Sequence, residues 1–223
     1  MNNLNILYED NHVIVVVKPQ NILSQSDITN DSDMLTIIKQ YIKKKYNKPG
    51  NVYLGLVHRL DRPVGGVMVY AKSSKAASRL QKSMNNGEFH KKYLAVCYGL
   101  FNKKEGTMED YLLKKEDGNT IVTNKKDGKI SKLKYKVISE DTSNNLSLVE
   151  IELLTGRHHQ IRVQFSTRSH PLYGDQRYGR KDNKQICLWA YDLEFVHPIK
   201  KEWMKFEFLP PKIDGFKIFD NKY

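Results

Sequence analysis

The sequence predicts an α+β fold in which an extended, mixed and mostly antiparallel β-sheet is flanked by helices. Three features support this prediction: short apolar runs recur along the chain, polar turns join many of them, and two segments have the spacing of amphipathic helices. The length of 223 residues suits a single domain over positions 1–223, and 39% hydrophobic content can fill its core. We expect a basic cleft across the middle of this domain.

The first part of the chain predicts a hairpin followed by a helix. Residues 4–8 and 13–17 are short strands joined by a polar turn, and Pro19 ends the second because proline cannot donate to a strand ladder. The apolar residues from Met34 to Ile42 predict one face of a helix, and Asp31 to Asp33 offers its N-cap. The lysines at 43–45 complement the negative end of the helix dipole. These lysines could form a solvated helix end or contact a phosphate.

The remaining elements alternate in the same way. Residues 67–71 form an apolar run without alternation, which predicts a strand buried on both faces. Ser73 or Ser74 then caps a second helix, which the turn at 85–87 ends. The further expected strands are 91–98, 107–113, 119–123, 132–139, 146–154, 185–196 and 203–208.

One segment, TGRHHQIR at residues 155–162, leaves helix and strand open. The apolar residues from position 161 onward fit both the helical spacing and the two-residue alternation of a strand. Gly156 favours a helix start. On that interpretation His158 and Arg162 share a helical face, and the first free amides could meet an anion.

The charge balance predicts a polyanionic partner. The chain carries 37 Lys+Arg against 25 Asp+Glu, a formal charge of +12, and its pI is near 9.5. Nucleic acid is the leading candidate, and a lysine-rich surface without such a partner is the alternative that charge alone leaves open.

The cysteines and the N-terminus bear on the compartment. Cys97 and Cys187 stand singly in apolar runs, which predicts buried, reduced thiols and fits a reducing cytoplasm. The first residues lack the basic and apolar regions of a signal peptide, and no run approaches the roughly 18 apolar residues of a membrane helix. We expect a cytoplasmic monomer with no membrane partner.

The stretch HRLDRPVGGVMVYAK, residues 58–72, concentrates the candidate chemistry. Asp61 lies among His58, Arg59 and Arg62, and glycines and an apolar strand follow. Two roles fit this carboxylate: it caps a turn, or it is held ionised by an arginine and serves as a nucleophile or a base.

The motifs of cofactor enzymes are missing from the sequence. It contains no P-loop, no dinucleotide fingerprint, no HExxH and no Cys/His spacing suited to zinc. We therefore expect neither a cofactor nor a metal, and we interpret His58, His158 and His159 as residues that orient loops or touch RNA.

The motifs together resemble those of the RluA-type RNA pseudouridine synthases. The resemblance is carried by HRLD, by KKYLAV about thirty residues on, by TGRHHQIR and by PLYGDQRYG, and it extends over essentially the whole chain. It implies the pseudouridine synthase fold and an isomerisation of uridine in ribosomal or transfer RNA. The chain starts at the catalytic domain, without the N-terminal S4-type domain of larger relatives, so target recognition is expected in this domain.

The resemblance also implies a role for each candidate residue. Asp61 would be the catalytic aspartate, Tyr93 would stack on the flipped uracil, and Arg162 would pair with Asp61. Arg59 would enter the helix space vacated by the target nucleotide, since a planar guanidinium can stack there, and Leu188 would line the uracil pocket. The further expected substrate-binding residues are His58, Gly156, Arg157 and His159.

Two departures from the family pattern are present. Val64-Gly65-Gly66 replaces the Thr-Ser-Gly of many members, and Trp189 replaces a histidine. The threonine and serine hydroxyls are thus absent, and we expect no hydrogen bond from them to fix the Asp61 loop. Three other functions remain open: a catalytically idle RNA-binding protein or RNA chaperone, a nuclease or glycosidase that uses histidine and aspartate, and a structural ribosome-associated protein.

Overall fold

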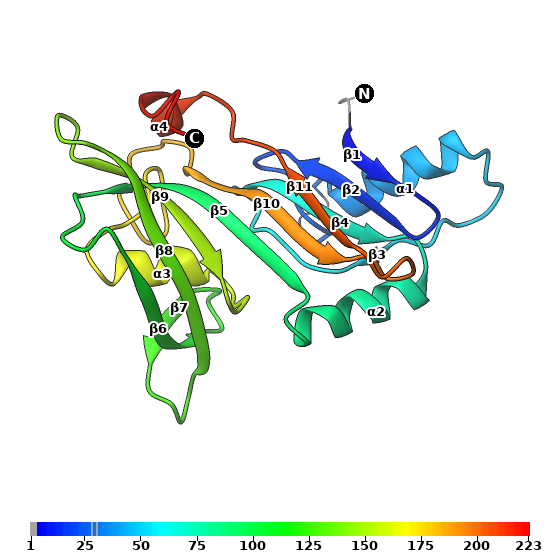
Figure 1. The fold of residues 1–223 in the computed structure, drawn as a ribbon, viewed down its shortest axis with the longest axis horizontal. Helices are drawn as coiled ribbons and strands as arrows, with labels where there is room; N and C mark the ends of the chain where they lie inside the picture. The colour runs from blue at the N-terminus through cyan, green and yellow to red at the C-terminus, as the bar shows by residue number, and fades with distance from the viewer. Residues whose placement is uncertain (1–3, 28, 30) are drawn as a thin grey trace. The chain divides into compact units, whose positions relative to one another are not determined.

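The computed structural model describes residues 4–27, 29 and 31–223, and these residues form two compact units (Figure 1). Unit 1 comprises Met1–His90 and Ala190–Phe208, and unit 2 comprises Lys91–Trp189 and Leu209–Tyr223. Two strands, β5 (Phe89–Tyr98) and β10 (Leu188–Val196), each have residues in both units. Each unit is described by itself below.

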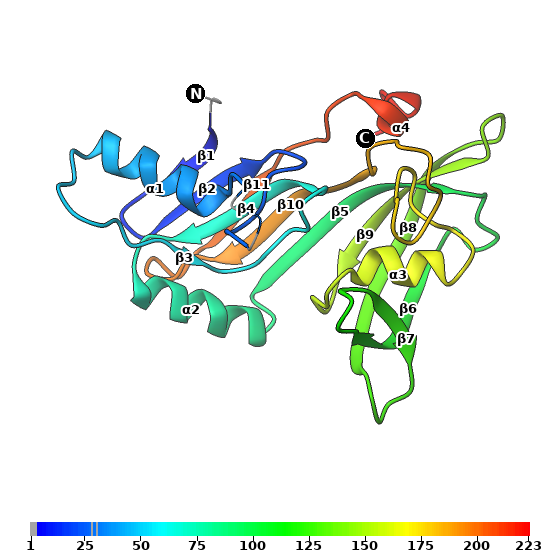
Figure 2. The same ribbon diagram turned by 180° about the vertical axis from the view of Figure 1, so that it is seen from behind.

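Unit 1 is built on a sheet in which β1, β2, β4 and β10 are successive neighbours (Figures 1 and 2). Besides β10, these strands are β1 (Asn5–Glu9), β2 (Val13–Lys18) and β4 (Gly65–Ala71). The unit also contains β3 (Gly55–Leu56) and β11 (Trp203–Glu207). β3 pairs with β4, and β11 pairs with β10. β2 and β4 are antiparallel and buried along their whole length, because apolar side chains on both of their faces are covered.

Two helices accompany this sheet. In α1 (Met34–Lys45) the Asp33 side chain accepts from the backbone N–H of Thr36, and in α2 (Ser74–Asn85) the Ser73 side chain accepts from that of Ala76. Each cap satisfies a helix N–H that has no partner inside the helix. The apolar face of α2 joins a core that includes β2 and β4 residues.

A carboxylate clamp joins β1 to α1 and to the end of β4. Glu9 Oε1 accepts from Lys72 Nζ at 2.7 Å and Tyr46 Oη at 2.9 Å, and Glu9 Oε2 accepts from Lys45 Nζ at 2.7 Å and Tyr41 Oη at 3.0 Å. Burial alone would raise the pKa of Glu9, but these four donors lower it to about 2. The clamp is therefore ionised at neutral pH.

Unit 2 contains an antiparallel sheet in the order β5, β9, β8, β6, β7. Its elements besides β5 are β6 (Glu105–Lys114), β7 (Thr120–Thr123), β8 (Lys129–Asp141), β9 (Leu146–Leu153), α3 (Gln160–Ser166) and α4 (Asp214–Ile218). In Figure 2 the helix α3 lies in front of this sheet. Its Phe165 is fully buried and meets the Tyr135 ring of β8 edge to face.

The structure confirms the α+β class and the expected helices and strands, with boundaries that shift by a few residues. It adds β3 and α4, which the sequence did not predict. β3 has two residues, and α4 has five residues and no side-chain cap, so neither carries a strong local pattern. The single domain and the central basic cleft stay predictions.

The ambiguous segment is a helix, but it begins later than expected. α3 starts at Gln160, and the residue before it, His159, has a left-handed φ of 50°. His158 therefore precedes the helix, and the prediction that it shares a helical face with Arg162 is wrong. The reason is that the chain turns at His159, so helical spacing does not extend back to position 158.

Candidate active site

Asp61 lies in unit 1, in the loop between β3 and β4. Its side chain is half-buried, and its backbone carbonyl accepts from the N–H of Val64 at 3.0 Å, which closes a four-residue turn. The turn delivers the chain directly into the buried strand β4. The position of Asp61 is thus tied to the core of unit 1.

A second segment holds this loop through neutral hydrogen bonds. The Ser24 hydroxyl donates to the carbonyl of Leu60 at 2.8 Å, and its oxygen accepts from the Leu60 N–H at 3.1 Å. The backbone N–H of Asn21 donates to the carbonyl of Arg62 at 2.8 Å. The residues on both sides of Asp61 are therefore anchored.

Lys18 adds a charged anchor to the same loop. It is fully buried, and its amine donates to the carbonyls of Pro19, Ile22 and Arg62 at 3.0, 2.5 and 3.1 Å. Burial lowers the pKa of Lys18 to about 7, against the opposing effect of the Asp61 charge. One anchor of the Asp61 loop is therefore a lysine that titrates near neutral pH.

The second glycine after Asp61, Gly66, is needed for close packing. Gly66 has a φ of +132°, and a Cβ atom there would lie 2.2 Å from the backbone oxygen of Ala190 in β10. Only glycine fits this approach. Gly66 keeps the glycine of the usual Thr-Ser-Gly pattern, so this backbone contact does not depend on the two hydroxyls lost at positions 64 and 65. The Ser24 hydroxyl supplies hydrogen bonds to the loop.

The other candidates of unit 1 differ in exposure. His58 is buried, its Nε2 accepts from the N–H of Val69 at 3.2 Å, and its ring meets Phe89 edge to face. Arg59 is exposed, and Arg62 forms an exposed ion pair with Asp31 at 2.8 Å. His58 thus packs in the interior, which fits the interpretation that it orients the loop. The substrate-contact roles of His58 and Arg59 stay predictions.

In unit 2, Arg162 of α3 forms a bidentate ion pair with Asp175. Its Nε lies 2.8 Å from Asp175 Oδ2 and its Nη2 lies 2.7 Å from Asp175 Oδ1, and both side chains are at least nine-tenths buried. Burial raises the pKa of the Asp175 carboxyl, but hydrogen bonds and charge from Arg162 outweigh it and hold the pKa below its ordinary value. A buried pair of this geometry fixes the guanidinium plane.

A network of rings surrounds this pair. The backbone N–H of Tyr178 donates to Asp175, and the Arg162 guanidinium carbon lies 5.2 Å from the centre of the Tyr178 ring. The Tyr178 hydroxyl lies 2.7 Å from His159 Nδ1. His158 stacks on His159 and contacts the Thr120 hydroxyl at 2.9 Å through its own Nδ1. Both histidines thus help to orient the segment before α3.

The remaining candidates of unit 2 lie on strands or in a loop. Tyr93 of β5 is paired in register with Ile151 and is 5% exposed, and Leu188 opens β10 and is 4% exposed. Gly156 and Arg157 are exposed, and the Arg157 Nε donates to the carbonyl of Ile130 at 3.0 Å. The substrate-contact roles of these residues and of His159 stay predictions.

Asp61 and Arg162 belong to different units, so their pairing also stays a prediction. The sequence interpretation gave no role to Lys18, Ser24 or Asp175, although PLYGDQRYG contains the aspartate and Lys18-Pro19 ends a strand.

Among the described residues, no three His, Cys, Asp or Glu side chains are grouped so that they could hold a metal ion. No helix in the described part of the chain is long and apolar enough to cross a bilayer.

Similarity to known proteins identifies the family of this chain. The family profile of RNA pseudouridylate synthases matches residues 12–167. An uncharacterized RNA pseudouridine synthase of Aquifex aeolicus is 33% identical over 94% of this chain and 70% of its own length. The ribosomal large subunit pseudouridine synthase C of Salmonella typhimurium is 33% identical over 91% of this chain and 65% of its own length. This chain thus spans about two thirds of these relatives.

The solved structure of human RNA pseudouridylate synthase domain containing 4 has the same fold, with a TM-score of 0.77, 21% identity and coverage of 93% of this chain and 89% of that one. Fold and sequence together define an isomerase that acts on RNA. The chain belongs to the RluA-type family of RNA pseudouridine synthases.

Proposed function

We propose that this protein converts specific uridines of a structured RNA to pseudouridine, with Asp61 as the nucleophile or base. The observation that supports this role most is the anchoring of the Asp61 loop through Leu60 and Arg62, on either side of the aspartate. A catalytic carboxylate must be held in a fixed position relative to the reacting carbon, and such anchoring supplies that.

In the proposed reaction the N1–C1′ bond of uridine breaks, the uracil turns while bound, and C5 forms the new bond to C1′. The proton on C5 then leaves and N1 gains one, so no oxidant or reductant is needed. Asp61 starts the sequence by attacking C1′ or by removing a ribose proton, and both routes require an ionised carboxylate.

Arg162 and Tyr93 have supporting roles in this proposal. In this proposal the Arg162 guanidinium, whose plane Asp175 fixes, stabilises the ionised form of Asp61. Tyr93 stacks on the flipped uracil, and Leu188 bounds its pocket. Arg59, which is exposed, fills the space that the base leaves.

The substrate is an RNA in which the target uridine can leave its stack at low cost. Unstacking costs about a few kcal/mol and costs least in loops and bulges. Several relatives are named for the large ribosomal subunit, which makes ribosomal RNA the first class to test and transfer RNA the second.

The proposal is tested by mapping pseudouridine in cellular RNA with carbodiimide, in cells that carry the wild-type gene, no gene or Asp61→Asn. We expect sites that need the gene and that disappear with Asp61→Asn, and in vitro a rate loss of roughly 10³-fold or more. The matched control is Asp31→Asn, which removes the exposed partner of Arg62. Identical maps in all strains would reject the synthase function and leave the idle RNA-binding protein, whereas strand cleavage would indicate a nuclease.

A further inference from the structure

Trp203 presents a large aromatic surface to solvent in unit 1. It is the first residue of β11 and is 56% exposed, the largest value among the large hydrophobic residues in the described part of the chain. Its ring is nearly parallel to that of His90, with 5.4 Å between centroids and 20° between planes. His90 thus stacks against the indole, and the exposed indole is a surface of the kind on which unpaired bases stack.

Helix α2 of the same unit carries a basic face. Lys75, Arg79 and Lys82 recur at i, i+4 and i+7 of α2, and no Asp or Glu occurs from position 73 to 87. Like charges at this spacing repel one another, and Lys75 in the first turn opposes the helix dipole. The helix thus carries a charge arrangement that is unfavourable in isolation and that a polyanion would stabilise.

A hydrogen bond links the basic helix to the turn that precedes Trp203. The Arg79 Nη1 donates to the carbonyl of Pro198 at 3.0 Å, in the turn between β10 and β11. Both views show this turn beside α2 (Figures 1 and 2). We call Lys75, Arg79, Lys82, His90 and Trp203 together the Trp203 face.

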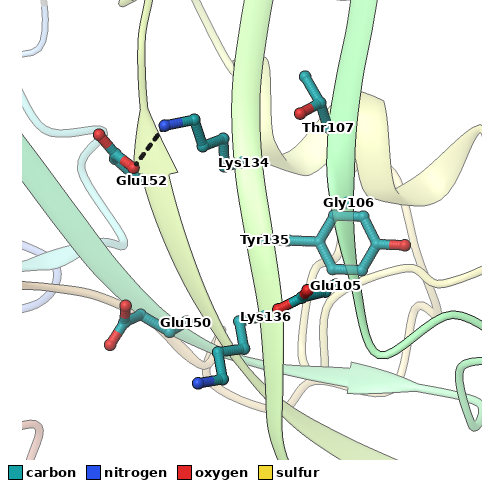
Figure 3. A pocket seen from close by; sticks show the side chains of 8 residues that line it. All are labelled: Glu105, Gly106, Thr107, Lys134, Tyr135, Lys136, Glu150 and Glu152. Carbon is teal, nitrogen blue, oxygen red and sulfur yellow. Dashed lines mark hydrogen bonds and ion pairs between the residues drawn. The ribbon is translucent and has the colours of Figure 1, made fainter.

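The sheet of unit 2 offers a contrasting lysine surface (Figure 3). There Lys134 pairs with Glu152 at 3.4 Å, and both are lining residues of one hollow. The other charged residues of this hollow are Lys136, Glu105 and Glu150. Because carboxylates surround these lysines, they should add little to the binding of a polyanion.

We propose that the Trp203 face binds a single-stranded segment of the substrate RNA away from the reacting uridine. Trp203 stacks on an unpaired base, and Lys75 and Lys82 contact the neighbouring phosphates. Charge complementarity selects RNA, because the face combines an aromatic surface with three cations. This inference rests on the proposed function, since it extends the recognition of the same substrate.

The first test uses fluorescence, because the chain has two tryptophans and the other, Trp189, is 4% exposed. A short oligouridine should quench the wild-type emission, and Trp203→Phe should remove the quenching but keep most of the affinity. Trp203→Ala should weaken binding of the labelled oligouridine about tenfold. Equal affinity of Trp203→Ala and wild type, or no quenching, would overturn the proposal.

The second test compares two double variants. Lys75→Gln/Lys82→Gln should reduce the slope of log affinity against log salt by about 1 to 2, because two phosphate contacts are lost. The matched control, Lys134→Gln/Lys136→Gln, should keep the wild-type slope. Equal slopes for both double variants would count against RNA binding by the Trp203 face. Self-association of the wild-type protein that Trp203→Ala abolishes would also count against it, because the face would then bind a second copy of the chain.

The outcomes for this face and for the proposed function can be told apart. If the Trp203 face is idle but the function is correct, its variants make pseudouridine in cellular RNA at the wild-type rate and KM, while Asp61→Asn makes none. If the function is wrong, the wild-type protein itself makes no pseudouridine.

Discussion

Unit 1 and unit 2 hold their candidate residues by different kinds of interaction. In unit 1 the Asp61 loop depends largely on neutral bonds to Ser24 and on the close backbone contact at Gly66. In unit 2 Arg162 depends on a buried ion pair with Asp175. The first arrangement should be most sensitive to an atom added at Gly66, and the second to the removal of a charge.

The largest expected effect is that of Gly66→Ala. The new Cβ would meet the backbone of Ala190 at 2.2 Å, so we expect a loss of more than about 4 kcal/mol in the free energy of unfolding, or no folded protein. The control is Gly87→Ala, where φ is also positive but nothing lies within 4 Å of the added atom. It should cost only about 1 kcal/mol. Similar losses in urea unfolding of both variants would mean that the contact is not what requires glycine.

Asp175→Asn should have the next largest effect. Removing one partner of a buried ion pair takes the bidentate carboxylate from the buried Arg162 guanidinium, which costs about 3 to 5 kcal/mol. The control is Asp117→Asn, an exposed turn carboxylate that should matter little. A change below about 1 kcal/mol would show that the pair does not hold Arg162.

The same variant gives a pH test. The folded pKa of Asp175 is lowered, so its contribution is present above the ordinary carboxyl pKa near 3.8 and is lost as pH falls through the folded value. The stability difference between wild type and Asp175→Asn should therefore be constant from neutral pH down to about 5 and should shrink in stronger acid. A constant difference down to the lowest measurable pH would contradict a charge-based anchor.

The smallest expected effect is that of Ser24→Ala. The buried backbone carbonyl and N–H of Leu60 both lose the hydroxyl that they bond, which costs about 1 to 3 kcal/mol in the free energy of unfolding. Because this anchor is neutral, the loss should be the same at low and high salt and between about pH 5 and 8. Ser143→Ala, at an exposed turn, is the control. A salt-dependent loss would remove the contrast between the two units.

Most of the fold could be predicted from local sequence. The aspartate and serine caps began α1 and α2 where they were expected, and the apolar run of β4 is buried on both faces. The segment after Gly156 could not be decided, because its apolar spacing fits helix and strand equally. The structure has a short helix there, α3, which begins directly after the left-handed residue His159.

The sequence by itself determined which residue types were available for the chemistry: an aspartate among bases, a tyrosine on a strand and an arginine near a glycine. Only the tertiary structure decided which residues hold them. Asp175 meets Arg162 across 13 positions of sequence, Ser24 meets Leu60 across 36, and Lys18 meets Arg62 across 44. Such contacts depend on how strands and loops pack, and the local spacing of residues in the sequence does not predict them.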